Sequence, residues 1–371
     1  MARLSPRDNL LSLLRRQGYE TAPCDLDFCP SQKEAFARHL AAAGEPTGTT
    51  LGGHFGFDLF PLGYLPYPAP RPRPEPVDWN VYFRHAPLAP DAFVNPVWGI
   101  GHEHGSEAAF HMTRMRHPME KFDSVGEFEA YPWPDFGDDA LDAAALAEHA
   151  AKCHAKGLAV WGGMACTIWE TAWYLRSMEN LMMDMASDDP MAGYLLDRVT
   201  EQSVHLARRM TKAGADLICI GDDIGMQSRP MMSMDLYREW IKPRLARVIA
   251  AARAVNPDII IDYHSCGYVL PFIDDLIEVG VDVLNPIQPE SMSFAEIHAR
   301  WGDRLSFRGT LGTQTTFPFG TPDEVRKTVR DNLSLAGAKG GLWCTPTHMV
   351  EPEVPWENIL AYVDACRSFR S

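Results

Sequence analysis

The 371-residue sequence predicts an α/β protein of the (β/α)8 barrel class with an amino-terminal insertion rich in proline and aromatic residues. Three observations lead to this fold class. From about residue 150 onward, short apolar runs alternate with amphipathic stretches. Residues capable of chemistry recur at the carboxyl ends of those runs, as at the rim of a barrel. No Gly/Ser-rich linker or low-complexity tract divides the chain, so we expect one domain over residues 1–371.

The amino-terminal third contains the first expected elements. Ser5 is a candidate helix cap, with Pro6 at the first helical position and Asp8 placed to reach back to the cap. Residues 22–28 are a candidate early strand. Residues 50–136 break the alternation, and we expect them to form an insertion after the first strand. Such an insertion can fold over the barrel mouth, or it can form a surface arm used in dimerisation.

The remaining strands and helices follow in regular order. Strands are expected at residues 158–162, 217–221, 259–264, 283–287, 305–309 and 341–344. Helices are expected between them, among them 233–255, where Ser233 is a candidate cap, and 321–335, which opens with the capping box TPDE. This repeated strand–helix order predicts a parallel sheet.

Composition excludes several classes of partner. A formal net charge of −15 and a pI near 5.3 argue against a nucleic acid, which is held mainly by Lys and Arg. Eight cysteines spread along a long chain are typical of a reducing compartment. No segment approaches the ~20 apolar residues of a membrane span, and the start of the sequence lacks a signal-peptide core. We therefore expect a cytoplasmic protein.

The most informative motif is His264-x-Cys266, followed by Gly267 at the end of an apolar run. In a strand, residues i and i+2 share a face, so the imidazole and the thiolate can converge on one ion. A third ligand would complete an open catalytic zinc site, and Cys344 and His348 are the two late candidates. A buried Cys and a strand-end His without metal are the alternative.

Carboxylates follow two of the expected strands. Asp222, Asp223 and Gln227 lie in the stretch GDDIGMQ after one strand, which puts two acids and an amide at the barrel rim. They can position a substrate, move a proton or balance the charge of a metal, or they can simply cap a helix and pair with Arg229. Glu170 holds the comparable place after an earlier strand, where an ordinary acid at a helix start is the alternative.

Other polar motifs are less specific. His102 and His104 form a second His-x-His pair, but with no third ligand nearby we expect a solvated loop there. Gln288, Arg308 and Gln314 follow strands and can either bind substrate or hold loops. The stretch 262–267 also matches Asp-x-His-x-x-Gly of cobalamin-binding loops. The other segments of that module are missing, so the overlap is interpreted as accidental, although it leaves His264 with two possible metals, zinc and cobalt.

Taken together, these stretches resemble the uroporphyrinogen decarboxylase superfamily, within it the branch of zinc-dependent methylcobamide:thiol methyltransferases of the coenzyme M type. The likeness covers about residues 150–368, with a similar opening at 5–11. It is carried by the motifs GDD at 221–223, HSCG at 264–267, VLNPIQ at 283–288, GTPDEV at 320–325 and PWENI at 355–359. The resemblance implies a (β/α)8 barrel. The Arg-Gln-Ala-Gly-Arg segment of the true decarboxylases is missing, which speaks against porphyrin decarboxylation.

The resemblance also implies a ligand set. His264 and Cys266 match two zinc ligands of the methyltransferase branch, whose third ligand is a late Cys. Counted back from the PWENI motif, that position is His348, with Cys344 four residues earlier. We prefer His348 as the third ligand and keep Cys344 as the fallback. Loss of one thiolate makes such a site less electron-rich.

The resulting expectation is a zinc-dependent methyltransferase that moves a methyl group between a small methylated substrate or thiol and a corrinoid. The corrinoid would be carried on a partner protein. In that chemistry zinc lowers the pKa of a bound thiol, or it acts as a Lewis acid on the methyl donor. In the second case the insertion, which is rich in aromatic residues, would suit an aromatic methyl donor. The alternatives are a metal-independent lyase of the decarboxylase type and a non-enzymatic corrinoid or tetrapyrrole carrier. A homodimer would be unsurprising.

Overall fold

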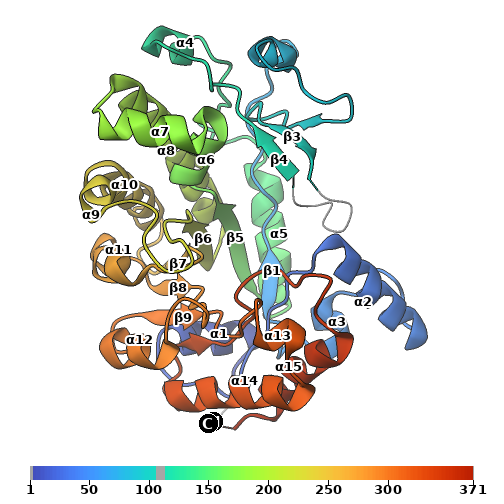
Figure 1. The fold of residues 1–371 in the computed structure, drawn as a ribbon. Coiled ribbons are helices and arrows are strands. Elements are labelled where there is room, and N and C mark those ends of the chain that lie inside the picture. The colour runs from blue at the N-terminus through green and yellow to red at the C-terminus, as the bar shows by residue number, and fades with distance from the viewer. Residues whose placement is uncertain (1–2, 106–112, 371) are drawn as a thin grey trace.

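The fold, seen in a computed structural model that describes residues 3–105 and 113–370, is of the predicted TIM-barrel type (Figure 1). Seven strands of the described chain form one parallel sheet, and neighbouring strands follow each other in sequence order. They are β1 (Leu62–Tyr64), β5 (Ala159–Ala165), β6 (Leu217–Gly221), β7 (Ile260–His264), β8 (Val283–Asn285), β9 (Ser306–Arg308) and β10 (Leu342–Trp343). The six strands predicted after residue 150 are therefore confirmed, with ends shifted by up to three residues.

Helices connect these strands and cover the outside of the sheet (Figure 1). The amino-terminal and insertion helices are α1 (Pro6–Leu14), α2 (Pro30–Ala42), α3 (Leu51–Phe55), a 3-10 helix (Trp79–Phe83) and α4 (Val125–Glu129). Those of the alternating region are α5 (Ala143–Ala155), α6 (Trp169–Arg176), α7 (Met178–Ala186), α8 (Pro190–Ala213), α9 (Met234–Leu236), α10 (Lys242–Arg253), α11 (Ile273–Val279), α12 (Phe294–Trp301), α13 (Thr316–Phe319), α14 (Pro322–Ala336) and α15 (Trp356–Ser368), with a 3-10 turn at Leu270–Phe272. None of the helices described combines the length and apolar character that a membrane-spanning segment requires.

Local signals placed the helix starts correctly. Asp8 N donates to Ser5 Oγ at 3.1 Å, and Thr321 forms the reciprocal capping box of α14. The predicted helix at 233–255 begins at its Ser233 cap, but α9 and α10 are separated by a π-helical turn at Tyr237–Ile241. Pro243 at the start of α10 has no N–H for the regular helical ladder, which accounts for the irregular turn.

The predicted early strand at 22–28 takes a different form, because it spans the gap between the two edges of the sheet. The N–H of Cys24 donates to Leu59, which precedes β1, at 2.5 Å. Val350, after β10, makes one parallel bridge with Phe28. The segment thus occupies the place of an eighth strand without joining a regular ladder.

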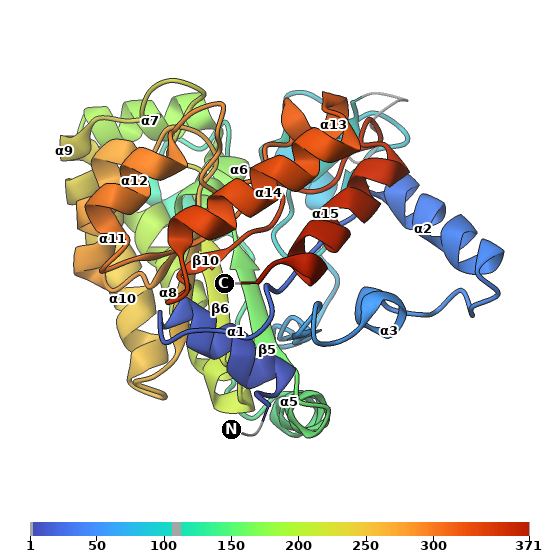
Figure 2. The same cartoon turned by 90° about the horizontal axis from the view of Figure 1, so that it is seen from below.

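The amino-terminal end of the barrel is closed by α1, which lies across it in Figure 2. Its leucines pack on the first residues of the strands in a separate apolar cluster. That cluster contains Leu10, Leu11, Leu13, Leu14, Ala159, Leu217, Ile260, Val283 and Trp343. Above it, Arg308 forms an ion pair with Asp262 at 2.8 Å, and both side chains are largely buried. The barrel interior is therefore apolar at the α1 end and becomes polar toward the carboxyl ends of the strands.

The predicted insertion at 50–136 contributes both to the barrel and to a structure outside it. Strand β1 belongs to the main sheet, whereas β2 (Phe93–Val94), β3 (Gly101–His104) and β4 (Thr113–Arg116) form a separate antiparallel sheet. Figure 1 shows this small sheet beside the end of the barrel from which α6 starts. Residues 106–112 of the predicted insertion lie outside the described residues.

Candidate metal centre and adjoining cavity

The two aspartates after β6 point in different directions. Asp222 is 1% exposed and accepts the N–H groups of Ile168 (3.0 Å) and Glu170 (2.9 Å), so it holds the start of α6. Burial raises the pKa of Asp222 to about 6, although these N–H groups favour its charged form. Asp223 is more exposed and accepts the N–H of Cys266 at 2.7 Å. The first aspartate is thus a structural anchor, and the second faces the end of β7.

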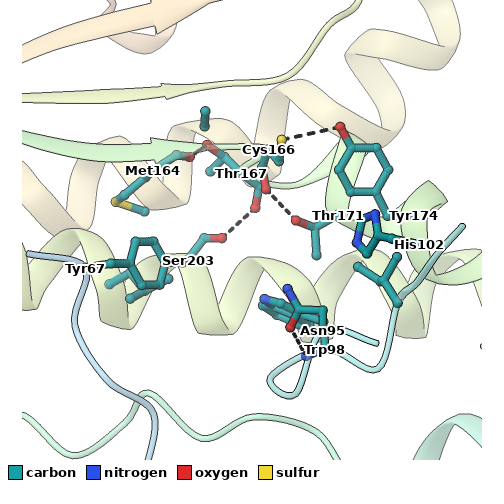
Figure 3. A pocket seen from close by; sticks show the side chains of 13 residues that line it. Tyr67, Asn95, Trp98, His102, Met164, Cys166, Thr167, Thr171, Tyr174 and Ser203 are labelled. Carbon is teal, nitrogen blue, oxygen red and sulfur yellow. Dashed lines mark hydrogen bonds between the residues drawn. The ribbon is translucent and has the colours of Figure 1, made fainter. Parts of the chain in front are cut away.

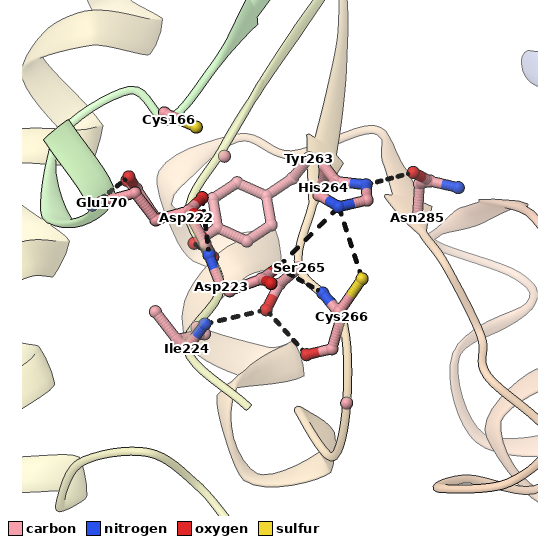
Figure 4. Close-up of polar contacts among 12 residues, drawn as sticks. Cys166, Glu170, Asp222, Asp223, Ile224, Tyr263, His264, Ser265, Cys266 and Asn285 are labelled. Atoms are coloured by element: carbon pink, nitrogen blue, oxygen red, sulfur yellow. Dashed lines mark hydrogen bonds and ion pairs between the residues drawn. The ribbon is translucent and has the colours of Figure 1, made fainter. Parts of the chain in front are cut away.

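The predicted pair after β7 converges as expected (Figure 4). His264 Nε2 lies 3.5 Å from Cys266 Sγ and 3.8 Å from Asp223 Oδ1. The other ring nitrogen, Nδ1, lies 2.6 Å from Asn285 Oδ1, which aims Nε2 at the cluster. Among the described residues, Asp223, His264 and Cys266 form a group whose ligand atoms all lie within 4.8 Å of one another.

Close backbone packing fixes this geometry. A Cβ on Gly221, whose φ is +141°, would collide with the backbone of His264, so glycine lets β6 approach β7 beneath the cluster. Gly267, with φ +81°, packs on the backbone of Met226 in the same way. The N–H of Gly267 donates to Gln288 Oε1, which gives Gln288 a loop-holding role. The loop that carries Cys266 is therefore held from both sides.

The donor set fits a divalent zinc ion. One imidazole, one thiol and one carboxylate are the ligand types that zinc accepts, and a three-ligand site leaves a position open. Burial lowers the pKa of His264, which favours the neutral imidazole that a metal requires. Burial and the nearby Asp223 raise the pKa of the Cys266 thiol. Metal binding would therefore have to displace a proton from Cys266, which makes affinity depend on pH.

The two late candidates for a third ligand lie in different surroundings. The His348 ring is exposed, and its centroid is 6.5 Å from that of His264, so His348 borders the cluster. Cys344 is 1% exposed, its Sγ lies 3.4 Å from Thr310 Oγ1, and it packs in the core outside the barrel. Successive residues of a strand face opposite sides, and Trp343 already occupies the inner side. Among the described residues, the group that could hold a metal contains neither late candidate and includes Asp223 instead.

A hydrogen-bonded wall stands beside the cluster. Glu170 Oε2 accepts the N–H of Asp223 at 3.1 Å, and its Oε1 accepts from the Tyr174 hydroxyl at 2.8 Å. The same hydroxyl lies 3.5 Å from Cys166 Sγ. Burial, together with the charges of Asp222 and Asp223, raises the pKa of Glu170 to about 8. Glu170 therefore holds a proton at neutral pH next to the donor set.

A cavity of about 210 Å³ lies on the other side of this wall (Figure 3). One side is built by the end of β5 and by α6, including Cys166 and Tyr174. The opposite side is built by the insertion, through Tyr67, Trp98 and His102. The insertion therefore lies beside the candidate site as part of a pocket wall.

The remaining candidates lie away from the donor set. Gln227 is exposed and its Oε1 accepts from Gln314 Nε2 at 3.3 Å, so these two residues join loops at the rim. Arg308 is held by Asp262 deeper in the barrel. His102 lines the cavity with Nδ1 2.9 Å from Thr113 Oγ1, whereas His104 is exposed 3.8 Å from Asp91. The His102/His104 pair, expected in a solvated loop, instead lies on strand β3.

Some of these residues were not singled out from the sequence. Asn285 ends β8 just before Pro286, and its strand-end position was the available signal. Tyr174 lies four residues after Glu170 on α6, a spacing that puts both on one helix face. The cavity residues Tyr67 and Trp98 of the insertion carry no periodic signal, because they come from irregular backbone.

Comparisons with known proteins cover most of the barrel. Residues 110–369 match the uroporphyrinogen decarboxylase (URO-D) family. The methylcobamide:CoM methyltransferase MtaA of Methanosarcina barkeri is 29% identical over 170 residues, which are 46% of this chain and 47% of the relative. A uroporphyrinogen decarboxylase of Chlorobium limicola is 28% identical over 185 residues, 48% of this chain and 50% of the relative.

The chain thus spans about half the length of the curated relatives it matches. A solved structure described as a methyltransferase from Methanosarcina mazei covers 98% of both chains with a TM-score of 0.66 at 20% identity. This structural match supports the barrel fold over the whole chain.

Proposed function

The chain belongs to the uroporphyrinogen decarboxylase family, and we propose that within it the protein is a zinc-dependent methyltransferase. It would move a methyl group between a small methylated substrate or thiol and a corrinoid carried by a partner protein. Similarity to MtaA supports a methyltransferase-type enzyme. The observation that carries the proposal is the convergence of Asp223, His264 and Cys266 at the carboxyl ends of β6 and β7.

In this proposal His264 and Cys266 hold the ion, and Asp223 or His348 completes the set. A bound zinc ion supplies a Lewis acid that lowers the pKa of a thiol or polarises the heteroatom of a methyl donor. Asn285 orients His264 through Nδ1, and Asp223 holds the backbone of Cys266. These contacts keep the donor atoms together before any ligand arrives.

Glu170 is the residue we assign to proton handling. Its carboxyl is protonated at neutral pH and lies beside Asp223, within the wall that separates the cluster from the cavity. When a methyl group leaves an oxygen, that oxygen keeps the bonding electron pair and must take up a proton. The cobalt(I) corrinoid supplies the electron pair of the new cobalt–carbon bond and becomes cobalt(III). In the reverse sense, a thiol loses its proton and its sulfur accepts the methyl group.

The lyase alternative is weakened by the charges near the site. Decarboxylation of a polycarboxylate needs cationic side chains to hold the substrate. Arg308 lies inside the described barrel, but Asp262 already neutralises it at 2.8 Å. Asp223 adds a partly exposed carboxylate at the cluster itself. An acidic site of this kind disfavours a substrate with several carboxylates.

Metal content provides the first test. Protein purified without chelator should contain about one zinc per chain, and His264→Ala and Cys266→Ser should each lose it. Asp223→Asn and His348→Ala are compared to identify the third ligand, because the variant of the true ligand should lose zinc. Cys344→Ser should keep zinc, and Cys153→Ser on α5 is the matched control for cysteine replacement. A well-folded wild type that cannot be loaded with zinc would overturn the proposal.

Methyl transfer is measured in parallel. Formation of methylcobalamin from cobalt(I) cobalamin and a methyl donor, or its consumption by a thiol, reports the reaction without knowledge of the natural partner. Activity that follows zinc content across the variants supports the proposed function. Equal activity in zinc-free and zinc-loaded protein contradicts it.

A further inference from the structure

Helices α2 and α3, with the loop between them, form a unit at the side of the barrel next to α15 (Figures 1 and 2). This α2–α3 unit, residues 30–55, connects the segment at 22–28, which fills the place of an eighth strand, with β1. The buried residues of α2 are Gln32 and Leu40. Most of α2 is therefore at least partly accessible to solvent, and the contacts with α15 become important for holding the unit.

Four side chains form a hydrogen-bonded chain between this unit and α15. Trp356 Nε1 of α15 lies 3.1 Å from His39 Nδ1 on α2. His39 Nε2 lies 3.0 Å from His54 Nε2 on α3. His54 Nδ1 lies 2.8 Å from Glu45 Oε1, in the loop between α2 and α3. The chain therefore ties both helices of the unit to α15.

The donors and acceptors of this chain fix the tautomers of both histidines. An indole N–H can only donate, so His39 Nδ1 accepts and the hydrogen of a neutral His39 lies on Nε2. That hydrogen points at His54 Nε2, so a neutral His54 carries its own hydrogen on Nδ1 and donates to Glu45. The three contacts are thus all satisfied when both imidazoles are neutral.

One additional proton cannot be placed without breaking a contact. A proton on His39 Nδ1 would face the N–H of Trp356, and a proton on His54 Nε2 would face the N–H of His39. If His39 then moved its hydrogen to Nδ1, two donors would meet at Trp356 instead. Protonation of either ring therefore costs one hydrogen bond of the chain.

Aromatic rings surround the pair and disfavour a charge on it. The ring centroid of Phe55 lies 4.5 Å from that of His54, and the ring centroid of Trp356 lies 4.8 Å from that of His39. Burial is the largest cause that lowers the pKa of His39, and the neighbouring His54 lowers it further. Glu45 acts in the opposite direction and raises this pKa.

Glu45 is the charged side chain that contacts the pair. The described contacts of the two imidazoles include none of the other charged residues of α2 and α15, which are Lys33, Glu34, Arg38, Glu357, Asp364 and Arg367. Arg38 lies 4.0 Å from Glu34, and Arg367 lies 3.9 Å from Asp364, so these four residues pair with one another. The charge state of the chain therefore depends on His39, His54 and Glu45.

We propose that His39 and His54 form a pH-sensitive latch, which docks the α2–α3 unit on α15 while both rings are neutral and releases it when the pair takes up a proton. The docked state binds this proton less readily than the released state does, because the pKa of docked His39 is lowered. Docking is therefore strongest above the ordinary histidine pKa of about 6.5 and weakens as the pH falls from there through the lower docked-state pKa. Release loosens the side of the barrel where the segment at 22–28 makes no regular ladder.

Hydrogen–deuterium exchange of the full chain tests the latch and requires neither metal nor methyl donor, so its outcome is independent of the proposed function. Exchange is followed by mass spectrometry at about pH 7.5 and about pH 5.5, and rates are corrected for the intrinsic pH dependence of amide exchange. We expect protection of α2 and α3 to fall by at least about tenfold at the lower pH, while α8 and α10 keep theirs. Unchanged protection of α2 and α3 would overturn the proposal, and so would an equal fall in all four helices, because it would indicate global unfolding by acid.

A double variant assigns the pH response to the two histidines. Glutamine has one carbonyl to accept and one amide group to donate, and it carries no charge at either pH. In His39→Gln/His54→Gln, protection of α2 and α3 should therefore be alike at both pH values. His149→Gln on α5 is the matched control and should respond like wild type. A pH response that persists in the double variant would refute the latch.

Glu45→Gln provides a second test that leaves both histidines in place. Its amide oxygen can still accept from His54 Nδ1, but the negative charge that favours protonation of the pair is lost. The midpoint of release should therefore move to lower pH by roughly half a unit or more. Glu34→Gln removes an exposed charge from α2 and should leave the midpoint unchanged. An unmoved midpoint in Glu45→Gln would contradict the proposal, because a purely structural hydrogen bond would not shift it.

Discussion

The two ends of the barrel have different compositions and different tasks. At the amino-terminal end, α1 leucines and residues near the starts of the strands form an apolar cluster whose side chains are buried. At the carboxyl end, the strands finish in Asp223, His264, Asn285 and Cys266, which remain partly accessible or hydrogen-bonded to one another. Apolar packing thus fills one end of the barrel, and the candidate metal-binding groups gather at the other. Changes at the two ends should therefore have separable effects.

The largest effect is expected for a substitution at the carboxyl end of the barrel, which should lower activity and leave stability nearly unchanged. His264→Ala removes a proposed metal ligand, and we expect the proposed methyl transfer to fall by about a thousandfold or more, roughly 4 kcal/mol of transition-state stabilisation. Metal-free variant and metal-free wild type should unfold at similar denaturant concentrations, since His264 adds little apolar burial. His298→Ala on α12 is the matched control. Cooperative unfolding lost together with activity would show that the two ends are not separable.

The next effect is on stability at the opposite end. Leu13 is fully buried in the α1 cluster, and Leu13→Ala should lower the free energy of unfolding by about 2–5 kcal/mol. Zinc stoichiometry at low temperature should stay at the wild-type value. Leu4→Ala, at a position 37% exposed, serves as the control in urea unfolding. Loss of zinc from folded Leu13→Ala would contradict the division between the ends.

A smaller effect, on zinc affinity, is expected when the residue that orients His264 is replaced. Asn285 touches His264 Nδ1 at 2.6 Å but is not itself a ligand. Asn285→Ala should weaken zinc affinity by about 10–100-fold, because the imidazole loses its orienting partner. Competition with a chromogenic chelator measures this affinity, and Asn256→Ala in the loop after α10 is the control. Unchanged affinity would mean that strand packing alone orients His264.

The sequence was most informative where periodicity and spacing determine direction. Alternating apolar runs predicted the barrel, and the i, i+2 spacing of His264 and Cys266 predicted their convergence, which the geometry matches. Asp223 joins His264 and Cys266 because β6 approaches β7 closely at Gly221. The spacing of residues along the sequence does not reveal this approach. The inward or outward direction of Cys344 follows from its neighbour Trp343, but only once the strand's bounds are known. Cavity residues such as Trp98 come from irregular insertion backbone, whose course no local pattern determines.

The smallest effect concerns acid stability at the amino-terminal end, where Arg7 of α1 binds Asp216 before β6 at 2.6 Å. Burial would raise the pKa of Asp216, but hydrogen bonds from Arg7, Val160 N and His154 lower it below its ordinary value overall. A carboxyl group with a lowered folded-state pKa stabilises the protein above its unfolded pKa of about 3.9. This contribution should be lost as pH falls from about 4 through the lower folded-state pKa.

Asp216→Asn should therefore cost about 1–3 kcal/mol at pH 7 and progressively less as the pH falls below about 4, where wild type has lost the same contribution. The exposed pair of Arg3 and Asp58 is the control, because Asp58→Asn should change stability by less than about 1 kcal/mol at any pH. Urea unfolding of wild type, Asp216→Asn and Asp58→Asn at several pH values measures the stability changes of the two variants. A cost for Asp216→Asn that does not vary with pH would show that packing of the side chain, and not its charge, holds α1 against the barrel. Zinc content at pH 7 should be the same in all three proteins, because Asp216 lies at the end of the barrel opposite the donor set.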